Sequence, residues 1–133
     1  MTDQHPNAQR ILRWLQAFND NNLDAIKTIF TEKLVYRVAG HGPISREYRG
    51  VEDYVTNLLG WVKQRSDNTV TFEPVVLLAD DHAVMLLARI TAQRAGKRLT
   101  GENVFMFRFD DTGECIEGRT IPVDQSAFDA FWS

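Results

Sequence analysis

Hydrophobic residues in the first half of the chain recur at helical spacing, whereas those in the second half alternate as they do in strands. Residues 7–19 predict a helix, because the apolar positions there recur at steps of three and four and share one face. These positions are Ile11, Trp14, Leu15 and Phe18. Helical sequence followed by strand sequence indicates an α+β fold.

A short helix and a strand are expected next. Asn21 and Asn22 are candidate caps for the helix, because asparagine side chains accept hydrogen bonds from the first backbone N–H groups. The apolar face of this helix would comprise Leu23, Ile26, Ile29 and Phe30. Residues 34–39 predict a strand, which the glycines and proline of residues 40–43 end in a loop.

A third helix is predicted after a brief extended piece at residues 46–49. It begins at Gly50 and reaches about residue 65, with acidic residues in its first turn and basic residues in its last, as the helix dipole favours. Its apolar face would comprise Val51, Tyr54, Val55, Leu58, Leu59 and Val62.

From residue 69 onward the pattern predicts four strands of an antiparallel meander, with turns at residues 80–82, 95–97 and 110–113. Pro74 lies within the first of them, so we expect a bulge or a sheet edge there. The third strand alternates clearly, and the face expected to be buried comprises Leu99, Gly101, Asn103, Phe105, Phe107 and Phe109. A terminal helix carries Ala127, Phe128, Phe131 and Trp132.

Composition and charge narrow the class of protein. The chain has 133 residues, of which 44% are hydrophobic and 25% charged, so we predict one globular domain over residues 1–133. The formal net charge is −3, with both signs interspersed, which argues against nucleic acid as a partner. No apolar run is long enough to span a membrane. The single cysteine, Cys115, and an N-terminal segment (residues 2–16) without the apolar core of a signal peptide favour a cytoplasmic location.

The order of elements and several motifs resemble a known family. Helices followed by a long curved meander resemble the cone-shaped fold of the nuclear transport factor 2-like superfamily. Three stretches are similar to its SnoaL-like and ketosteroid isomerase-related branch: residues 36–44 with 48–50, residues 107–116, and residues 124–132. The resemblance implies a pocket between the concave sheet face and the helices for one small, largely apolar molecule. It also implies a homodimer formed through the sheet, whose convex face carries Val104 and Met106.

The acidic residues that a ketosteroid isomerase uses have no counterpart at the matching positions. The base would fall at Val38, Ala39 or Gly40, and the buried acid of the oxyanion site at about Phe105. None of these residues can transfer a proton. The sequence therefore argues against the steroid isomerase mechanism.

Three residues are candidates for chemistry. Asn103 interrupts the apolar inward face of its strand, and its amide can donate to a ligand carbonyl or bond to backbone or a buried water. His41 lies in the loop after the first strand and is our candidate general acid or base; an exposed histidine without chemistry is the alternative. Asp124 can act as a base at the pocket edge or, as we favour, cap the terminal helix.

The aromatic residues Trp14, Tyr36, Trp61 and Phe105 are candidate ligand contacts, although aromatic residues at helical spacing also serve simply as core. The histidines lack the spacing of a metal site, so we predict no metal, and acid–base chemistry would need no cofactor. The function predicted is binding of a small apolar molecule, with isomerase- or cyclase-type catalysis by His41 and Asn103 as one form of it. The alternative is a non-catalytic ligand-binding or homodimeric assembly module.

Overall fold

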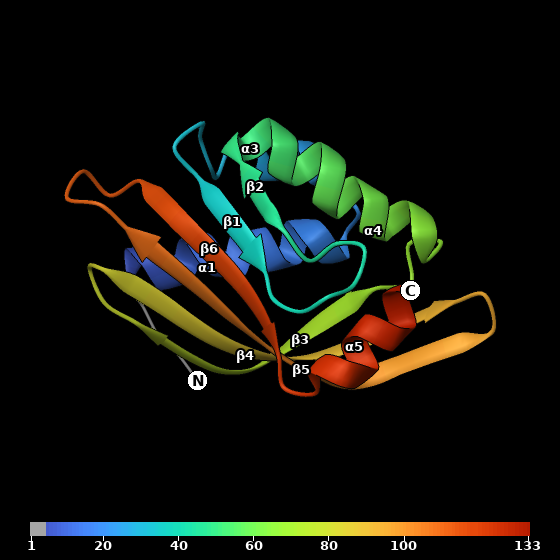
Figure 1. Ribbon diagram of the computed structural model, residues 1–133. Helices are drawn as coiled ribbons and strands as arrows, with labels where there is room; N and C mark the ends of the chain where they lie inside the picture. The colour runs from blue at the N-terminus through green and yellow to red at the C-terminus, as the bar shows by residue number, and fades with distance from the viewer. Residues whose placement is uncertain (1–4) are drawn as a thin grey trace.

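The computed structural model describes residues 5–133 and shows one curved sheet with helices packed against it (Figure 1). The helices are α1 (Pro6–Asn19), α2 (Leu23–Ile26), α3 (Gly50–Asp53), the π-helical segment η1 (Tyr54–Leu59), α4 (Gly60–Arg65) and α5 (Gln125–Trp132). The strands are β1 (Val35–Val38), β2 (Glu47–Arg49), β3 (Thr71–Ala79), β4 (Ala83–Arg94), β5 (Lys97–Phe109) and β6 (Cys115–Pro122). The predicted α+β architecture is confirmed. Of the N-terminal segment considered above, residues 2–4 lie outside the described residues.

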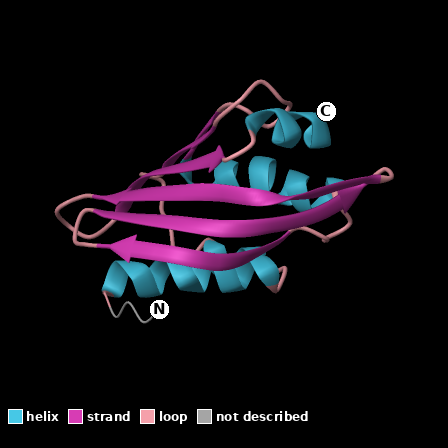
Figure 2. Ribbon diagram, turned by 90° about the horizontal axis from the view of Figure 1, so that it is seen from below, coloured by secondary structure: helices cyan, strands magenta, loops and turns pink. Residues whose placement is uncertain are grey.

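The six strands lie in the order β2-β1-β6-β5-β4-β3. Strands β3 to β6 pair antiparallel with their neighbours along the chain, so the predicted meander is confirmed. The one parallel pair joins β1 to β6, which are distant in the sequence. In Figure 2 the long strands lie in front and the helices behind or beside them, which leaves one face of the sheet uncovered.

Pro74 satisfies both predictions made for it. The register shifts between Pro74 and Val76, which marks a bulge, and β3 is the last strand of the sheet. A proline is tolerated there because an edge strand has ladder positions that need no backbone N–H.

The inward face of β5 anchors α1. Phe105 is 2% exposed and Phe107 is fully buried, as the alternation along the strand predicts. The ring centroid of Trp14, on α1, lies 5.1 Å from that of Phe105 and 5.2 Å from that of Phe107, both in edge-on contacts. Such aromatic contacts fix the helix over the concave face.

Two predicted helix caps are present. The Asn22 side chain accepts a hydrogen bond from the backbone N–H of Ala25 at 3.3 Å, and α2 starts there. The Asp124 carboxylate accepts one from the backbone N–H of Ala127 at 3.1 Å, which caps α5. Each bond satisfies an N–H group that has no partner within its helix.

The helix predicted from Gly50 is not one regular α-helix. It contains the π-helical segment η1, and the backbone N–H of Gly60 bonds to the carbonyl of Val55, five residues earlier. A π turn is wider than an α turn, but Tyr54, Leu58 and Leu59 still lie on the inward face that their helical spacing predicts. Local periodicity did not predict this widening.

Candidate functional site

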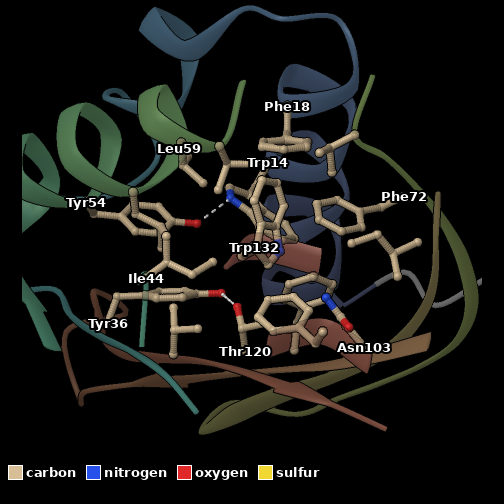
Figure 3. A pocket seen from close by; sticks show the side chains of 17 residues that line it. Trp14, Phe18, Tyr36, Ile44, Tyr54, Leu59, Phe72, Asn103, Thr120 and Trp132 are labelled. Carbon is tan, nitrogen blue, oxygen red and sulfur yellow. Dashed lines mark hydrogen bonds between the residues drawn. The ribbon is translucent and has the colours of Figure 1, made fainter. Parts of the chain in front are cut away.

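A cavity lies between the concave face of the sheet, the helices α1, η1 and α4, and the terminal helix α5 (Figure 3). Its walls are mostly aromatic and aliphatic side chains. Its free volume is about 40 Å³. A single water needs roughly 10–15 Å³, so the cavity as it stands holds no more than a few waters.

Two pairs of polar side chains in the wall satisfy each other. The indole N–H of Trp14 donates to the hydroxyl oxygen of Tyr54 at 2.9 Å. The hydroxyl groups of Tyr36 and Thr120 share a hydrogen bond at 2.6 Å. Both bonds are visible in Figure 3, and both cross between elements that are distant in the sequence.

Among residues 5–133, the cavity wall contains no group that ionises near neutral pH. Its only ionisable residues in this range are Tyr36 and Tyr54. Desolvation by burial raises the pKa of both phenols above the ordinary value of 10. The walls are therefore uncharged at neutral pH.

Two other polar side chains in the wall have no partner among residues 5–133. Asn103 is 2% exposed, and no hydrogen bond reaches its carboxamide, which borders this cavity and a smaller neighbouring one. The Nε1 atom of Trp132, on α5, is fully enclosed and is likewise unpaired. A fully enclosed polar group without a partner costs about 1–3 kcal/mol, and this cost applies to the Trp132 indole nitrogen. The Asn103 carboxamide is buried but not sealed, so it can still bond to a water or a ligand in the cavity.

Three of the aromatic residues predicted to contact a ligand line the cavity: Trp14, Tyr36 and Phe105. Trp61 does not. Its ring packs against that of Trp132, with the centroids 5.6 Å apart, so it supports the wall from behind.

The predicted acid–base residues lie outside the cavity wall. His41 is exposed, and its backbone N–H donates to Oδ2 of Asp129 at 3.1 Å. Asp124 is exposed, caps α5 and borders the smaller cavity beside Asn103. The structure thus brings Asp124 near Asn103, whereas His41 remains apart from it, and the catalytic roles of both stay predictions.

The sequence interpretation did not single out Tyr54, Thr120 or Trp132 as site residues. Tyr54 was placed only in the apolar face of its helix, and Trp132 only in the packing of the terminal helix. The inward position of Thr120 on β6 was the available signal for that residue.

Two reactive side chains are buried near the cavity without lining it. Lys63 is 5% exposed and its Nζ lies 3.8 Å from the centroid of the Phe18 ring. Desolvation lowers its pKa from 10.5 to about 8. Burial raises the pKa of the Cys115 thiol to about 12, so this cysteine is protonated and unreactive near neutral pH.

Residues 5–133 offer neither a cluster of metal ligands nor a helix able to cross a membrane. No group of three or more His, Cys, Asp or Glu side chains in this range could hold a metal ion. Within the same range, no helix is both long enough and apolar enough to cross a membrane.

A model of the SnoaL-like domain family matches residues 11–117. The chain therefore belongs to the SnoaL-like domain family, within the nuclear transport factor 2-like superfamily. No curated protein sequence matches it.

Solved structures share the whole fold. Bal32a, from a soil-derived mobile gene cassette, is 29% identical, with 96% of each chain covered and a TM-score of 0.88. A nuclear transport factor 2-like protein of unknown function from Burkholderia pseudomallei is 13% identical, covers 98% of this chain and 99% of its own, and has a TM-score of 0.85. A protein named as a SnoaL-like polyketide cyclase, from Jannaschia, is 15% identical, covers 100% and 99%, and has a TM-score of 0.77. At these last two identities the likeness shows the fold alone.

Proposed function

We propose that this chain binds one small, uncharged, largely apolar molecule in the cone, and that Asn103 recognises a polar group on it. The observation that carries the proposal is the Asn103 carboxamide, which is buried, faces the cavity and has no partner among residues 5–133. A carboxamide both donates and accepts hydrogen bonds, so it suits a carbonyl or hydroxyl group on a ligand. The uncharged walls favour a neutral molecule, because a charged one would lose its hydration without compensation.

Acetophenone and ethylbenzene test this proposal, because they have nearly the same shape and differ in one carbonyl oxygen. We expect ¹⁵N-labelled protein to bind acetophenone about 5–10-fold more tightly, as one hydrogen bond implies. Asn103→Leu should remove this preference and keep the binding of ethylbenzene. Asn57→Leu, which changes an exposed asparagine, is the matched control. Equal preference in wild type and Asn103→Leu would show that Asn103 does not recognise the ligand.

Membership of the SnoaL-like family and the similarity to a protein named as a polyketide cyclase favour a second candidate, a cofactor-independent isomerase- or cyclase-type enzyme. In that enzyme the Asn103 amide would donate to the oxygen on which negative charge develops. The proton would have to reach His41 or Asp124, both outside the cavity wall.

Exchange of the acetophenone methyl hydrogens with D₂O separates the two candidates. An acid–base enzyme of this kind removes a methyl proton, holds the enolate oxygen and returns a deuteron. Exchange faster than in buffer, lost in His41→Ala or Asp124→Asn, would support the enzyme. Binding of acetophenone without such exchange would support the binding protein.

We also propose that the uncovered sheet face binds a second copy of the chain. Its side chains form two apolar rows across the strands: Val76, Leu87, Val104 and Ile121 in one, and Leu78, Met85 and Met106 in the other. Ion pairs flank the rows, Glu73 with Arg89 on one side and Glu117 with Arg119 on the other. An apolar centre with a polar rim is typical of protein interfaces.

Light scattering tests the homodimer. Val104→Lys places a charge in the middle of the apolar rows and should convert a dimer into a monomer. Thr100→Lys is the control, because Thr100 is exposed on the same strand outside the rows. A monomeric wild type, or a dimeric Val104→Lys protein, would contradict this interface.

A further inference from the structure

The enclosed indole nitrogen of Trp132 is the one buried side-chain polar atom in residues 5–133 that is both sealed and unpaired. Trp132 is 2% exposed, lies on α5 and forms part of the cavity wall (Figure 3). No protein group among residues 5–133 accepts a hydrogen bond from its N–H in this arrangement. A buried donor without a partner calls for an explanation, and a partner gained in another state of the protein is one.

The size of the cavity is a second reason to expect another arrangement of its walls. With about 40 Å³ of free space, it is too small for an aromatic ring with polar substituents. A wall must move outward before such a molecule can enter. The sheet is joined by continuous strand pairing, so its strands cannot move outward without the loss of many backbone hydrogen bonds.

Helix α5, unlike the strands, is not held by a ladder of backbone hydrogen bonds. Its polar contacts with the rest of the chain are made by single side chains. Gln125 donates to the carbonyl of Ala39 at 3.1 Å, and Asp129 accepts from the backbone N–H of His41. At the other end, Arg94 donates to the carbonyl of Phe131 at 2.9 Å, and Lys97 donates to that of Ala130 at 3.1 Å. An outward shift of α5 stretches these side-chain bonds but breaks no strand pairing.

We infer that α5 is the movable wall of the cavity and that Trp132 is a ligand-binding residue whose indole N–H donates to the ligand. The inference rests on the proposed binding function and adds a second recognised group to it. Asn103 and Trp132 supply N–H donors to one uncharged cavity. The ligand class is therefore a neutral aromatic compound with two acceptor oxygens, one for each donor.

The probes are 1,3- and 1,4-diacetylbenzene, with 4-isopropylacetophenone as the compound of similar shape that lacks the second carbonyl oxygen. We expect at least one diacetylbenzene to bind wild type about 5–10-fold more tightly than the control compound. Trp132→Phe keeps an aromatic ring and removes the donor, so it should abolish this difference. Trp61→Phe changes the ring that packs behind Trp132 and should preserve it.

A second measurement needs no variant in the cavity. In ¹H–¹⁵N spectra of the wild-type protein, the Trp132 indole resonance should move downfield with the diacetylbenzene and stay in place with 4-isopropylacetophenone. Amide exchange in α5 should change with the same probe.

The outcomes separate the inference from the proposed function. If acetophenone prefers wild type over Asn103→Leu while Trp132→Phe retains the full preference for diacetylbenzene, the inference fails and the binding function stands. An unmoved Trp132 indole resonance in the presence of bound diacetylbenzene also overturns the inference. If no acetyl compound binds, both fail.

Discussion

The hydroxyl oxygen of Tyr36 lies 2.6 Å from Oγ1 of Thr120, so β1 and β6 share a buried hydrogen bond across the parallel pair. Tyr36 is 1% exposed and Thr120 is 7% exposed. Both residues line the cavity, and the bond leaves neither hydroxyl as an unpaired buried group. The phenol and the threonine hydroxyl are already paired with each other, so Asn103 is the polar side chain of this part of the wall that is free to bind a ligand.

A double-mutant cycle tests this hydrogen bond. Tyr36→Phe and Thr120→Val should each destabilise the fold by about 1–2 kcal/mol, because each leaves one buried hydroxyl without a partner. The double variant should cost less than the sum of the two, since it leaves none. Urea unfolding of the four proteins measures the coupling. Additive costs would show that the bond contributes nothing.

Gly118 permits the Tyr36 ring to lie against β6. A Cβ at Gly118 would come 2.4 Å from Cδ2 of Tyr36. A tyrosine ring cannot bend away as a flexible chain can, so we expect Gly118→Ala to destabilise the protein by about 2–4 kcal/mol. Thermal unfolding measures the effect. Gly101→Ala is the control, because a Cβ there meets nothing within 4 Å.

If Asn103 serves to bind a ligand, its unpaired amide should make the ligand-free protein less stable than a variant with an apolar side chain at this position. Asn103→Leu replaces an unpaired buried amide with an apolar group of similar size, so we expect a gain of about 1–2 kcal/mol in the free energy of unfolding without ligand. Chemical denaturation measures it. A loss of stability would instead indicate that the amide is satisfied within the folded protein by ordered water.

The buried Lys63 should make the free energy of unfolding depend on pH. Because burial lowers its pKa from 10.5 to about 8, the unfolded chain binds more protons than the folded protein between these values. The Lys63 contribution to stability therefore rises with pH across that window and is lost as the pH falls through about 8. Lys63→Met should stabilise the protein by about 1–3 kcal/mol at pH 7.

The difference between Lys63→Met and wild type should shrink as the pH approaches 10.5. Denaturant unfolding of both proteins at several pH values measures this difference, and the subtraction removes the contribution of the buried tyrosines. A difference that does not change with pH would contradict the lowered pKa. Lys27→Met, at an exposed position whose surface ion pair with Glu52 contributes little to stability, is the control.

Much of the secondary structure could be read from local pattern. The buried face of β5 and the caps formed by Asn22 and Asp124 followed from residues a few positions apart. The bulge at Pro74 followed from the missing N–H of proline. The π-helical segment could not be predicted in this way, because the same pattern of apolar residues fits an α-helical turn and a π-helical turn.

The candidate site was only partly predictable. Asn103 stood out as a polar residue on an apolar face, and Trp14, Tyr36 and Phe105 were expected in the wall and lie there. Which of the polar groups remains unpaired could not be derived. That depends on distances between segments remote in the sequence, such as the 84 positions that separate Tyr36 from Thr120.

The sequence by itself determined most of the elements and their inward faces, because hydrophobic period and residue type are local properties. Only the tertiary structure decided that β1 pairs with β6, that the Trp14 indole N–H donates to Tyr54, and that the Asn103 amide and the Trp132 indole N–H have no partner among residues 5–133. It also decided how little space remains inside the cone. Pairing and free volume arise from the packing of distant segments, which no local pattern encodes.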